Sequence, residues 1–275
     1  MTALRKEMET RLRLRGLSER TIGTYLREVR FIAEFFHKSP DQLSTAEMQT
    51  YFMYLITERK LSRSKIITAH AGLRFFVERT LERPWQALAL PTMLKEKKLP
   101  ISLSKEKILK IFACVENVKY RNIVQVIYSS GARLSEALNL RIQDIDSAKM
   151  MIRIKAGKGK KDRYTILGKK ALVELREYWT QQKPKFYLFP GRTQQKPITP
   201  RHVQYAFQAA RKKAGIREHA TMHTLRHSFA VHLLESGCDI VQIQRLLGHS
   251  SIMTTIHYLR MRSIDPATIK NPFDD

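Results

Sequence analysis

Cysteine, long apolar runs and acidic side chains are all scarce in this chain. Its 275 residues include two cysteines, Cys114 and Cys238, with no Cys-x-x-Cys and no Cys/His cluster at metal-ligand spacing. A disulfide framework and a structural zinc site are therefore not expected. A signal peptide and a run of about 20 apolar residues are also absent, which predicts a cytoplasmic protein of a reducing compartment without a membrane span.

The shortage of acidic residues leaves a large positive charge. Fifty Lys and Arg stand against 25 Asp and Glu, a formal net charge of +25. Such a balance favours a polyanionic partner, with nucleic acid as the leading candidate, although membrane surfaces and ribosomes also attract basic proteins. The excess is spread over both halves of the chain rather than gathered in a tail, so both halves are expected to contact the polymer.

The length and the helix signals predict two domains. A chain of 275 residues exceeds the usual single domain of about 100–200 residues, and 43% hydrophobic content suffices for two cores. Residues 1–90 are predicted to form four helices, from a charged opening segment and three runs with apolar residues at helical spacing. The first precedes Gly16, Ser18 can cap the second, Ser44 and Glu47 form a capping-box pattern before the third, and Ser62 precedes the fourth. This helical bundle carries no mark of catalysis.

Between the two predicted domains the apolar periodicity lapses. Prolines flank a charged stretch here, and we assign residues 91–104 to an interdomain linker. Its lysines are candidates for contacts with a phosphate backbone, although a solvated charge run is the commoner explanation. These lysines are Lys95, Lys97 and Lys98.

The second predicted domain, residues 105–275, mixes helices with a small antiparallel sheet. Residues 151–155 and 163–167 alternate apolar and polar side chains around Ala-Gly-Lys-Gly-Lys-Lys, a pattern typical of a β-hairpin. Cap and breaker signals predict helices before and after it. They cover residues 105–112, 120–130, 169–181, 200–214, a helix carrying His223 and Arg226, one from Asp239 to Gly248, and a last one bearing Tyr258. The fold class is mainly α.

Five side chains in this domain suit chemistry at a phosphodiester. Arg133 and Arg226 offer forked donors of permanent charge for phosphate oxygens, His223 and His249 can transfer a proton or donate a hydrogen bond, and Tyr258 offers a phenol as nucleophile. A lone arginine is usually a surface charge and a lone tyrosine usually a packing group. The ordered set of Arg, His-x-x-Arg, His and Tyr favours the cleavage and rejoining of DNA.

Four segments resemble the signature blocks of the tyrosine recombinase (phage integrase) family: GARLSEALNLRIQDID, AGKGKKDRYTIL, HTLRHSFAVHLL and LLGHSSIMTTIHY. The resemblance spans the whole chain, with residues 1–90 similar to the SAM-like core-binding domain and residues 105–275 to the catalytic domain. It is similar in style to Xer-type and integron integrases. Because no large insertion lies between Phe189 and His223, the Xer-like or mobile-element subgroup is favoured.

The resemblance implies roles for further residues. Lys158 matches the lysine that protonates the leaving 5′-oxygen, while Lys160 and Lys161 are more suited to backbone phosphates. Glu136 matches an acidic position that orients groups of the active site; the alternative is an ordinary ion pair on a helix surface. His227, His232 and His257 receive no catalytic role.

The family reaction implies a set of partners. Tyrosine attack leaves a 3′-phosphotyrosyl link and a free 5′-hydroxyl, and exchange proceeds through a Holliday junction with neither metal nor ATP as cofactor. The partners implied are a double-stranded DNA target site and three further copies of the chain in a synaptic homo-tetramer, with a monomer in free solution. An accessory DNA-bending protein or a second recombinase is left open, as is docking of the C-terminal tail on a neighbour.

Two other interpretations remain open at this point. A type IB topoisomerase uses a similar set of Arg, Lys, Arg, His and Tyr to relax DNA without a partner site. A DNA-binding or directionality regulator with a vestigial catalytic set is the alternative from another class. The compact chain, the integrase-like bundle and the Leu-Leu-Gly-His block argue against the topoisomerase. Against the regulator stands the fact that none of the central catalytic positions is substituted.

Overall fold

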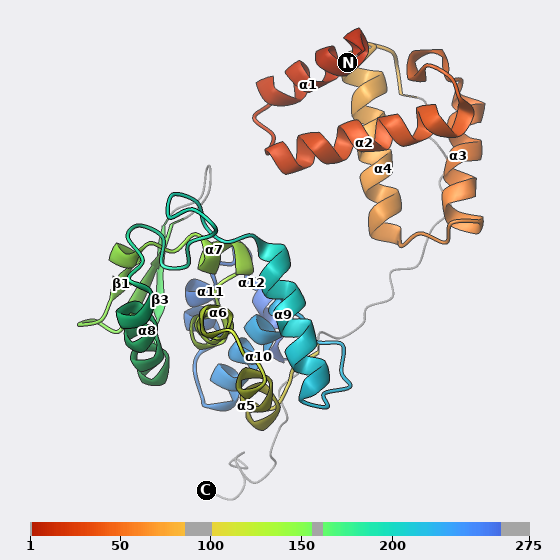
Figure 1. Ribbon diagram of the computed structural model, residues 1–275. Coiled ribbons are helices and arrows are strands. Elements are labelled where there is room, and N and C mark those ends of the chain that lie inside the picture. Colours follow the sequence, from red (N-terminus) through yellow and green to blue (C-terminus); the bar gives the residue numbers. More distant parts are fainter. Residues whose placement is uncertain (1, 86–100, 156–161, 260–275) are drawn as a thin grey trace, which may run out of the picture. The chain divides into compact units, whose positions relative to one another are not determined.

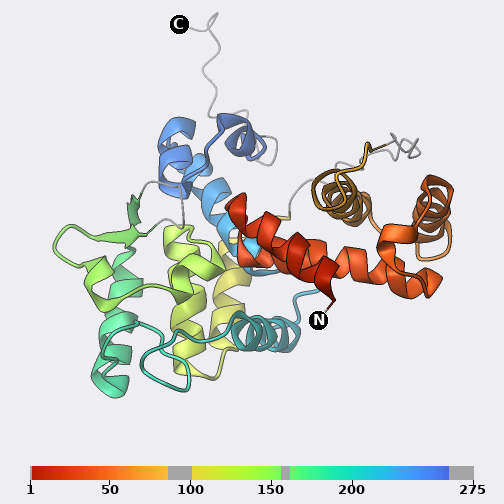
Figure 2. The same cartoon turned by 90° about the horizontal axis from the view of Figure 1, so that it is seen from above.

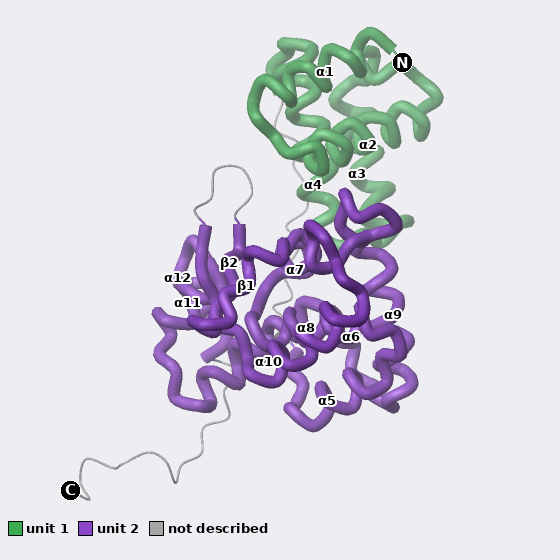
Figure 3. Tube along the Cα trace, turned by 60° about the vertical axis from the view of Figure 1, so that its left-hand side comes forward, with its two compact units in different colours: residues 1–97 green, residues 98–275 purple. Residues whose placement is uncertain are grey.

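The structure is a computed structural model that describes residues 2–85, 101–155 and 162–259 (Figure 1). The chain divides into two compact units, residues 1–97 and residues 98–275 (Figure 3). Six lysines predicted to contact DNA or to serve in catalysis lie outside the described residues: Lys95, Lys97, Lys98, Lys158, Lys160 and Lys161.

The N-terminal unit is the predicted bundle of four helices. Two predicted caps close as expected: the Ser18 hydroxyl accepts from the Thr21 amide, and Ser44 and Glu47 satisfy each other's backbone N–H. Helix α2 crosses α4 and packs against it (Figure 1). The helices are α1 (Ala3–Leu14), α2 (Glu19–Phe36), α3 (Thr45–Thr57) and α4 (Arg63–Phe75), with a 3-10 turn at Pro40–Gln42 and a π-helical turn at Phe76–Thr80.

In the second unit, helices surround a central helix α6. Helices α8, α9 and α10 all pack against α6, with α8 and the sheet on one side of it and α9 on the other (Figures 1 and 2). Within the described ranges no helix combines the length and the apolar character needed to cross a bilayer. The helices are α5 (Lys105–Ala113), α6 (Val118–Ser130), α7 (Leu134–Leu138), α8 (Lys169–Gln182), α9 (Pro200–Lys213), α10 (Met222–Glu235), α11 (Ile240–Leu247) and α12 (Ile252–Ile256).

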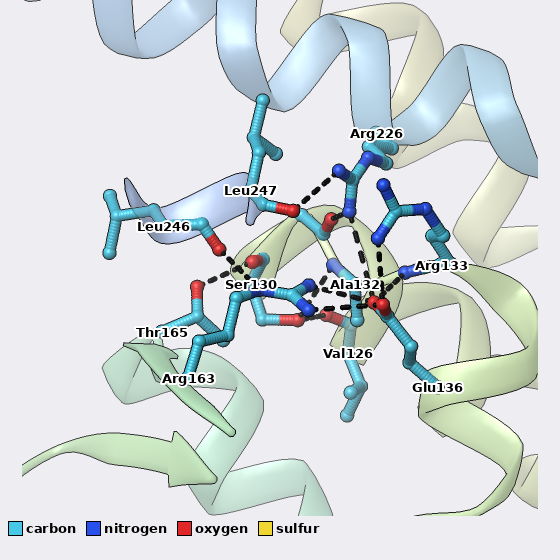
Figure 4. Close-up of polar contacts among 11 residues, drawn as sticks. Val126, Ser130, Ala132, Arg133, Glu136, Arg163, Thr165, Arg226, Leu246 and Leu247 are labelled. Atoms are coloured by element: carbon cyan, nitrogen blue, oxygen red, sulfur yellow. Dashed lines mark hydrogen bonds and ion pairs between the residues drawn. The ribbon is translucent and has the colours of Figure 1, made fainter. Parts of the chain in front are cut away.

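The predicted β-hairpin is present within a three-stranded antiparallel sheet of order β1-β2-β3. Strands β2 (Met151–Ile154) and β3 (Arg163–Ile166) pair in the register that sets Ile152 opposite Thr165. Strand β1 (Ile145–Asp146) was not predicted, because two residues are too few to show an alternating pattern. The hairpin directs the first residue of β3, Arg163, towards the helices that carry the predicted catalytic groups (Figure 4).

A glycine turn brings the predicted catalytic segments together. Gly131 ends α6 with a φ of 64°, in the left-handed region, and a Cβ there would lie 2.4 Å from the ring of Phe229 in α10 and 2.8 Å from the side chain of Leu247 in α11. The backbone after α6 therefore approaches both helices more closely than any other residue type allows. Arg133 follows two residues later.

Candidate active site

Groups from four separate segments of the second unit meet in one place. Arg133 comes from the turn after α6, Arg226 from α10, His249 from the turn after α11, and Tyr258 from the turn after α12. Both guanidiniums lie close enough to the Tyr258 phenol to lower its pKa, although burial, the larger effect, raises that pKa overall. The buried phenol, the buried Arg226 and Arg133, whose side chain is 34% exposed, thus lie together in one site, the catalytic pocket.

Arg226 is fixed by two backbone carbonyls. Its Nη1 donates to the oxygen of Gly131 at 2.6 Å and its Nη2 to the oxygen of Leu247 at 2.7 Å, and the residue is 3% exposed (Figure 4). Burial, followed by repulsion from Arg133, lowers the pKa of Arg226 to about 10. The guanidinium remains charged at neutral pH, and the carbonyl bonds use only two of its five N–H donors.

Glu136 holds Arg133. The Arg133 amide donates to one carboxylate oxygen at 2.7 Å, and Arg133 Nη1 donates to the other at 2.8 Å. Arg133 is the residue that caps α7 and is not within the helix, which begins at Leu134. Burial raises the pKa of Glu136, but hydrogen bonds from Arg163 and Arg133 outweigh it and bring the pKa to about 2. Glu136 is thus an ionised, partly buried carboxylate that binds more than one arginine, and not a member of an ordinary ion pair on a helix surface.

Arg163 also binds Glu136, which the sequence analysis missed. Its Nη1 and Nη2 donate to the two oxygens of the Glu136 carboxylate at 3.0 and 2.7 Å, and its Nε donates to the oxygen of Leu246 at 2.9 Å (Figure 4). The sequence signal was weak, because one arginine among many basic residues near a hairpin is read as a surface charge.

Tyr258 lies in a turn and not on a helix as predicted. Helix α12 ends at Ile256, and the Tyr258 amide donates to the oxygen of Thr255 at 2.9 Å. The residue is 2% exposed, and its hydroxyl forms a 2.9 Å hydrogen bond with Nδ1 of His227. A helical spacing pattern could not locate this end, because helices fray and tighten over their last turn.

The bond between Tyr258 and His227 joins two uncharged groups. Burial, helped by repulsion from His223 and Arg226, lowers the pKa of His227 to about 4, so its ring is neutral at pH 7. Because burial raises the pKa of Tyr258, the phenol keeps its proton. His227, to which no catalytic role was given, is therefore the neutral hydrogen-bond partner of the phenol. Its position beside Arg226 and four residues after His223 was the only sequence signal.

The two predicted histidines differ in their surroundings. His249 follows the left-handed Gly248, bonds to the hydroxyl of Thr255 through Nδ1 at 2.9 Å, and stacks on Tyr258 with ring centroids 6.2 Å apart. Burial first, then repulsion from Arg226, lowers its pKa to about 4. His223 is exposed at the start of α10, with its ring centroid 6.4 Å from that of His227. It lies at the edge of the pocket and not within it.

The remaining predictions for histidines concern residues outside the pocket. Nδ1 of His232 forms a 2.8 Å hydrogen bond with the Tyr128 hydroxyl, between α10 and α6, which is a packing contact. His257 is exposed.

Two family profiles match the chain, one for each unit. Residues 102–263 match the Phage integrase family, and residues 4–87 match the phage integrase N-terminal SAM-like domain. The chain belongs to the phage integrase family. Because the N-terminal match covers the bundle as well, the recombinase interpretation is favoured over a type IB topoisomerase.

Relatives of this family align over nearly the whole chain. A putative integrase/recombinase of Sinorhizobium fredii is 43% identical over all of this chain and 89% of its own length. The tyrosine recombinase XerA of Pyrococcus furiosus is 33% identical over 93% of this chain and 88% of its own length. This family member is accordingly a tyrosine-type site-specific recombinase.

Solved structures agree on the family fold. A crystal structure of XerA recombinase superposes with a TM-score of 0.55 at 25% identity, covering 96% of this chain and 94% of that one. A lambda integrase dimer bound to a COC′ core site gives a TM-score of 0.76 at 19% identity, covering 98% of this chain and 80% of that one.

Proposed function

We propose that this recombinase cleaves and rejoins duplex DNA with Tyr258 as the nucleophile. The observation that carries the proposal is the pocket in which a buried phenol, 2% exposed, lies within the electrostatic reach of two guanidiniums from distant segments. The phenol oxygen attacks phosphorus, the bond to the 5′-oxygen breaks, and a 3′-phosphotyrosyl link forms. Attack by another 5′-hydroxyl reverses the step, and two such exchanges pass through a Holliday junction.

The two arginines form the phosphate clamp in this proposal. A phosphodiester repels nucleophiles by its negative charge, so a catalyst must neutralise the nonbridging oxygens as charge builds up in the transition state. Arg226 is oriented by Gly131 and Leu247, and Arg133 by Glu136, before any phosphate arrives. Donors fixed in advance need no reorganisation during the reaction.

Two histidines and a lysine complete the proton transfers. His249 is neutral at pH 7 and lies in contact with the Tyr258 ring, so it can donate a hydrogen bond to a phosphate oxygen. His223, at the pocket edge, serves as a base or phosphate ligand once DNA covers it. Lys158, outside the described residues, protonates the departing 5′-oxygen, and the lysines at 95, 97, 98, 160 and 161 bind backbone phosphates.

A covalent-adduct assay tests the nucleophile. A duplex site selected from a random library by binding to the chain would carry a nick beside the cleavage point, so that the released fragment diffuses away and the adduct accumulates. The wild-type chain should form an adduct visible on a denaturing gel. Tyr258→Phe should form none and should bind the site with unchanged affinity. Adduct formation by Tyr258→Phe would falsify the assignment.

We also propose assembly of four copies on two duplexes, with the C-terminal tail of one copy on its neighbour. A shallow hollow between β3, α10 and α11 could receive the tail, and its apolar side chains include Tyr164, 54% exposed, and Ile166, 38% exposed. The tail itself contains Ile264, Ile269 and Phe273. Apolar side chains around a hollow commonly mark a contact surface.

Truncation separates the tail's role from catalysis. A chain ending at residue 262 should form fewer multimers on DNA in a crosslinking assay and should keep binding single sites. Unchanged assembly by the truncated chain excludes tail docking. Recombination by the purified chain alone on two such sites decides whether an accessory DNA-bending protein or a second recombinase is needed. A DNA substrate of this kind places the protein at the bacterial nucleoid, where it acts on the chromosome or on a mobile element.

A further inference from the structure

The Glu136 carboxylate lies among three guanidiniums, only two of which belong to the proposed phosphate clamp. Arg133, which caps α7, binds it, Arg226 Nη1 lies 3.8 Å from its Oε2, and Arg163 from β3 binds both of its oxygens (Figure 4). The bond with Arg163 is bidentate, the geometry that gives the strongest arginine–carboxylate pairs. Glu136 therefore has its firmest partner in the arginine that lies outside the proposed phosphate clamp.

Arg163 also supports the turn that presents His249. Its Nε donates to the oxygen of Leu246 in the last turn of α11, at 2.9 Å, where the exposed carbonyls form the negative end of the helix dipole. Gly248 follows with a φ of 64°, and a Cβ at this position would lie 2.6 Å from Cδ of Arg163. The backbone before His249 is thus folded closely against the Arg163 side chain.

The contacts of Arg163 leave little freedom to its guanidinium. The Arg163 side chain is 14% exposed and that of Glu136 is 16% exposed, so solvent screens their attraction only weakly. Three of the five N–H donors of Arg163 are used, two on Glu136 and one on Leu246. A buried charge so engaged is suited to hold its neighbours and not to bind a substrate.

We propose that Arg163 is a positioning residue that keeps the phosphate clamp free for DNA. By occupying both oxygens of Glu136, Arg163 limits the hold of this carboxylate on the guanidiniums of Arg133 and Arg226. Without Arg163, the unpaired oxygens of the buried Glu136 carboxylate attract those two guanidiniums, in competition with the scissile phosphate. The inference rests on the proposed function, because it assigns Arg163 to the same cleavage step.

Substrates with different charge at phosphorus distinguish this role from a merely structural one. Cleavage would be measured in single turnovers on the nicked duplex, with the protein in saturating excess, on a scissile phosphate and on a neutral methylphosphonate at the same position. Arg163→Met should cleave the phosphate about 10- to 100-fold more slowly, the usual loss when a partner that orients a reactive group is removed. On the methylphosphonate, where no negative charge needs to be clamped, the loss should fall below about threefold. An equal loss on both substrates overturns the proposal.

A double substitution tests the route of the effect. If Arg163 acts through Glu136, then Arg163→Met combined with Glu136→Gln should be no slower than the slower single variant, because neighbours that act as one unit are not additive. Additive losses contradict this route.

Two further variants control for charge and folding. Arg153→Met removes an arginine from the neighbouring strand, where it pairs with Asp162 at the surface, and should leave cleavage within about twofold. If Arg163→Met does not fold, as judged by circular dichroism and site binding, then Arg163→Lys takes its place, because lysine keeps the charge but not the fork. Its smaller loss should show the same dependence on phosphorus charge. Absence of any adduct with the wild-type chain defeats the proposed function itself, whereas an active wild type with an unaffected Arg163→Met defeats only this inference.

Discussion

The Arg163–Glu136 pair of the second unit differs in burial, and therefore in what it does, from the ion pairs on the helix surfaces of the N-terminal unit. In the N-terminal unit, Arg30–Glu34 has side chains 56% and 60% exposed, and Arg74–Glu78 has 55% and 28%. In the second unit, Arg163–Glu136 has 14% and 16%. Exposed pairs one helical turn apart contribute about 0.3–0.5 kcal/mol because water and salt screen them. Buried pairs fix geometry but lose hydration, so they stabilise a fold little while they hold reactive groups in place.

The surface ion pairs and the buried charge cluster around Glu136 therefore have different roles. The N-terminal bundle is held by its apolar core and its helix caps, and pairs such as Arg30–Glu34 lie on its surface. The second unit concentrates three arginines around one carboxylate at the meeting point of α7, α10, α11 and β3. Such a cluster is costly to bury and is expected where function requires it.

The largest expected difference between the units is in cleavage. Arg226→Ala and Arg133→Ala should each slow adduct formation roughly 100- to 1000-fold, the usual loss on removing one donor to a transition-state oxyanion. Arg74→Ala, in an exposed pair of the bundle, should leave the cleavage rate of pre-bound DNA within about twofold. Single-turnover rates on the nicked duplex measure all three. If Arg74→Ala slows cleavage as much as Arg226→Ala does, the contrast between surface and buried arginines is wrong.

Two glycines offer a matched test of packing. Gly131→Ala should destabilise the chain by about 2–4 kcal/mol, because its φ is 64° and the new Cβ meets Phe229 and Leu247. Gly23→Ala, in helix α2 with no atom within 4 Å of the new Cβ, should stabilise it by about 0.5–1 kcal/mol. Denaturant unfolding of the full chain gives both values. A stabilising Gly131→Ala shows that the turn after α6 is looser than described.

Acidification should weaken the second unit through its buried histidines. His249 and His227 have pKa values lowered to about 4, so the unfolded chain binds their protons more readily than the folded one. Stability should therefore fall as the pH drops from about 6.5 towards 4, by on the order of 1–3 kcal/mol for each ring. Glu136, with a pKa of about 2, contributes its loss only below about pH 4.5.

The matched control uses one histidine from each unit. Denaturant unfolding at pH 7 and pH 5 should show a smaller acid loss for His249→Gln than for the wild-type chain. His70→Gln in the bundle should change the acid loss less, because the lowering of the His70 pKa is the smaller of the two. If His249→Gln loses as much stability between pH 7 and pH 5 as the wild-type chain, the acid sensitivity does not come from His249.

Local signals explain why most of the fold was predictable. Ser18, Ser44 and Asp239 accept backbone N–H groups at helix starts, and Gly248 ends α11 in the left-handed region, as the residue types predicted. Strand β1 and the turn that carries Tyr258 were missed. Both are two-residue features, too short to show a repeating pattern.

Residue type and spacing alone predicted the chemistry, because only an arginine offers a permanent fork and Tyr258, nine residues after His249, stands where the phenol is expected. Tertiary structure decided which partners serve that chemistry. Arg163 reaches Glu136 across 27 positions, and His227 reaches the Tyr258 hydroxyl across 31. Contacts at such separations depend on how helices and strands pack, and local sequence carries no period that records them.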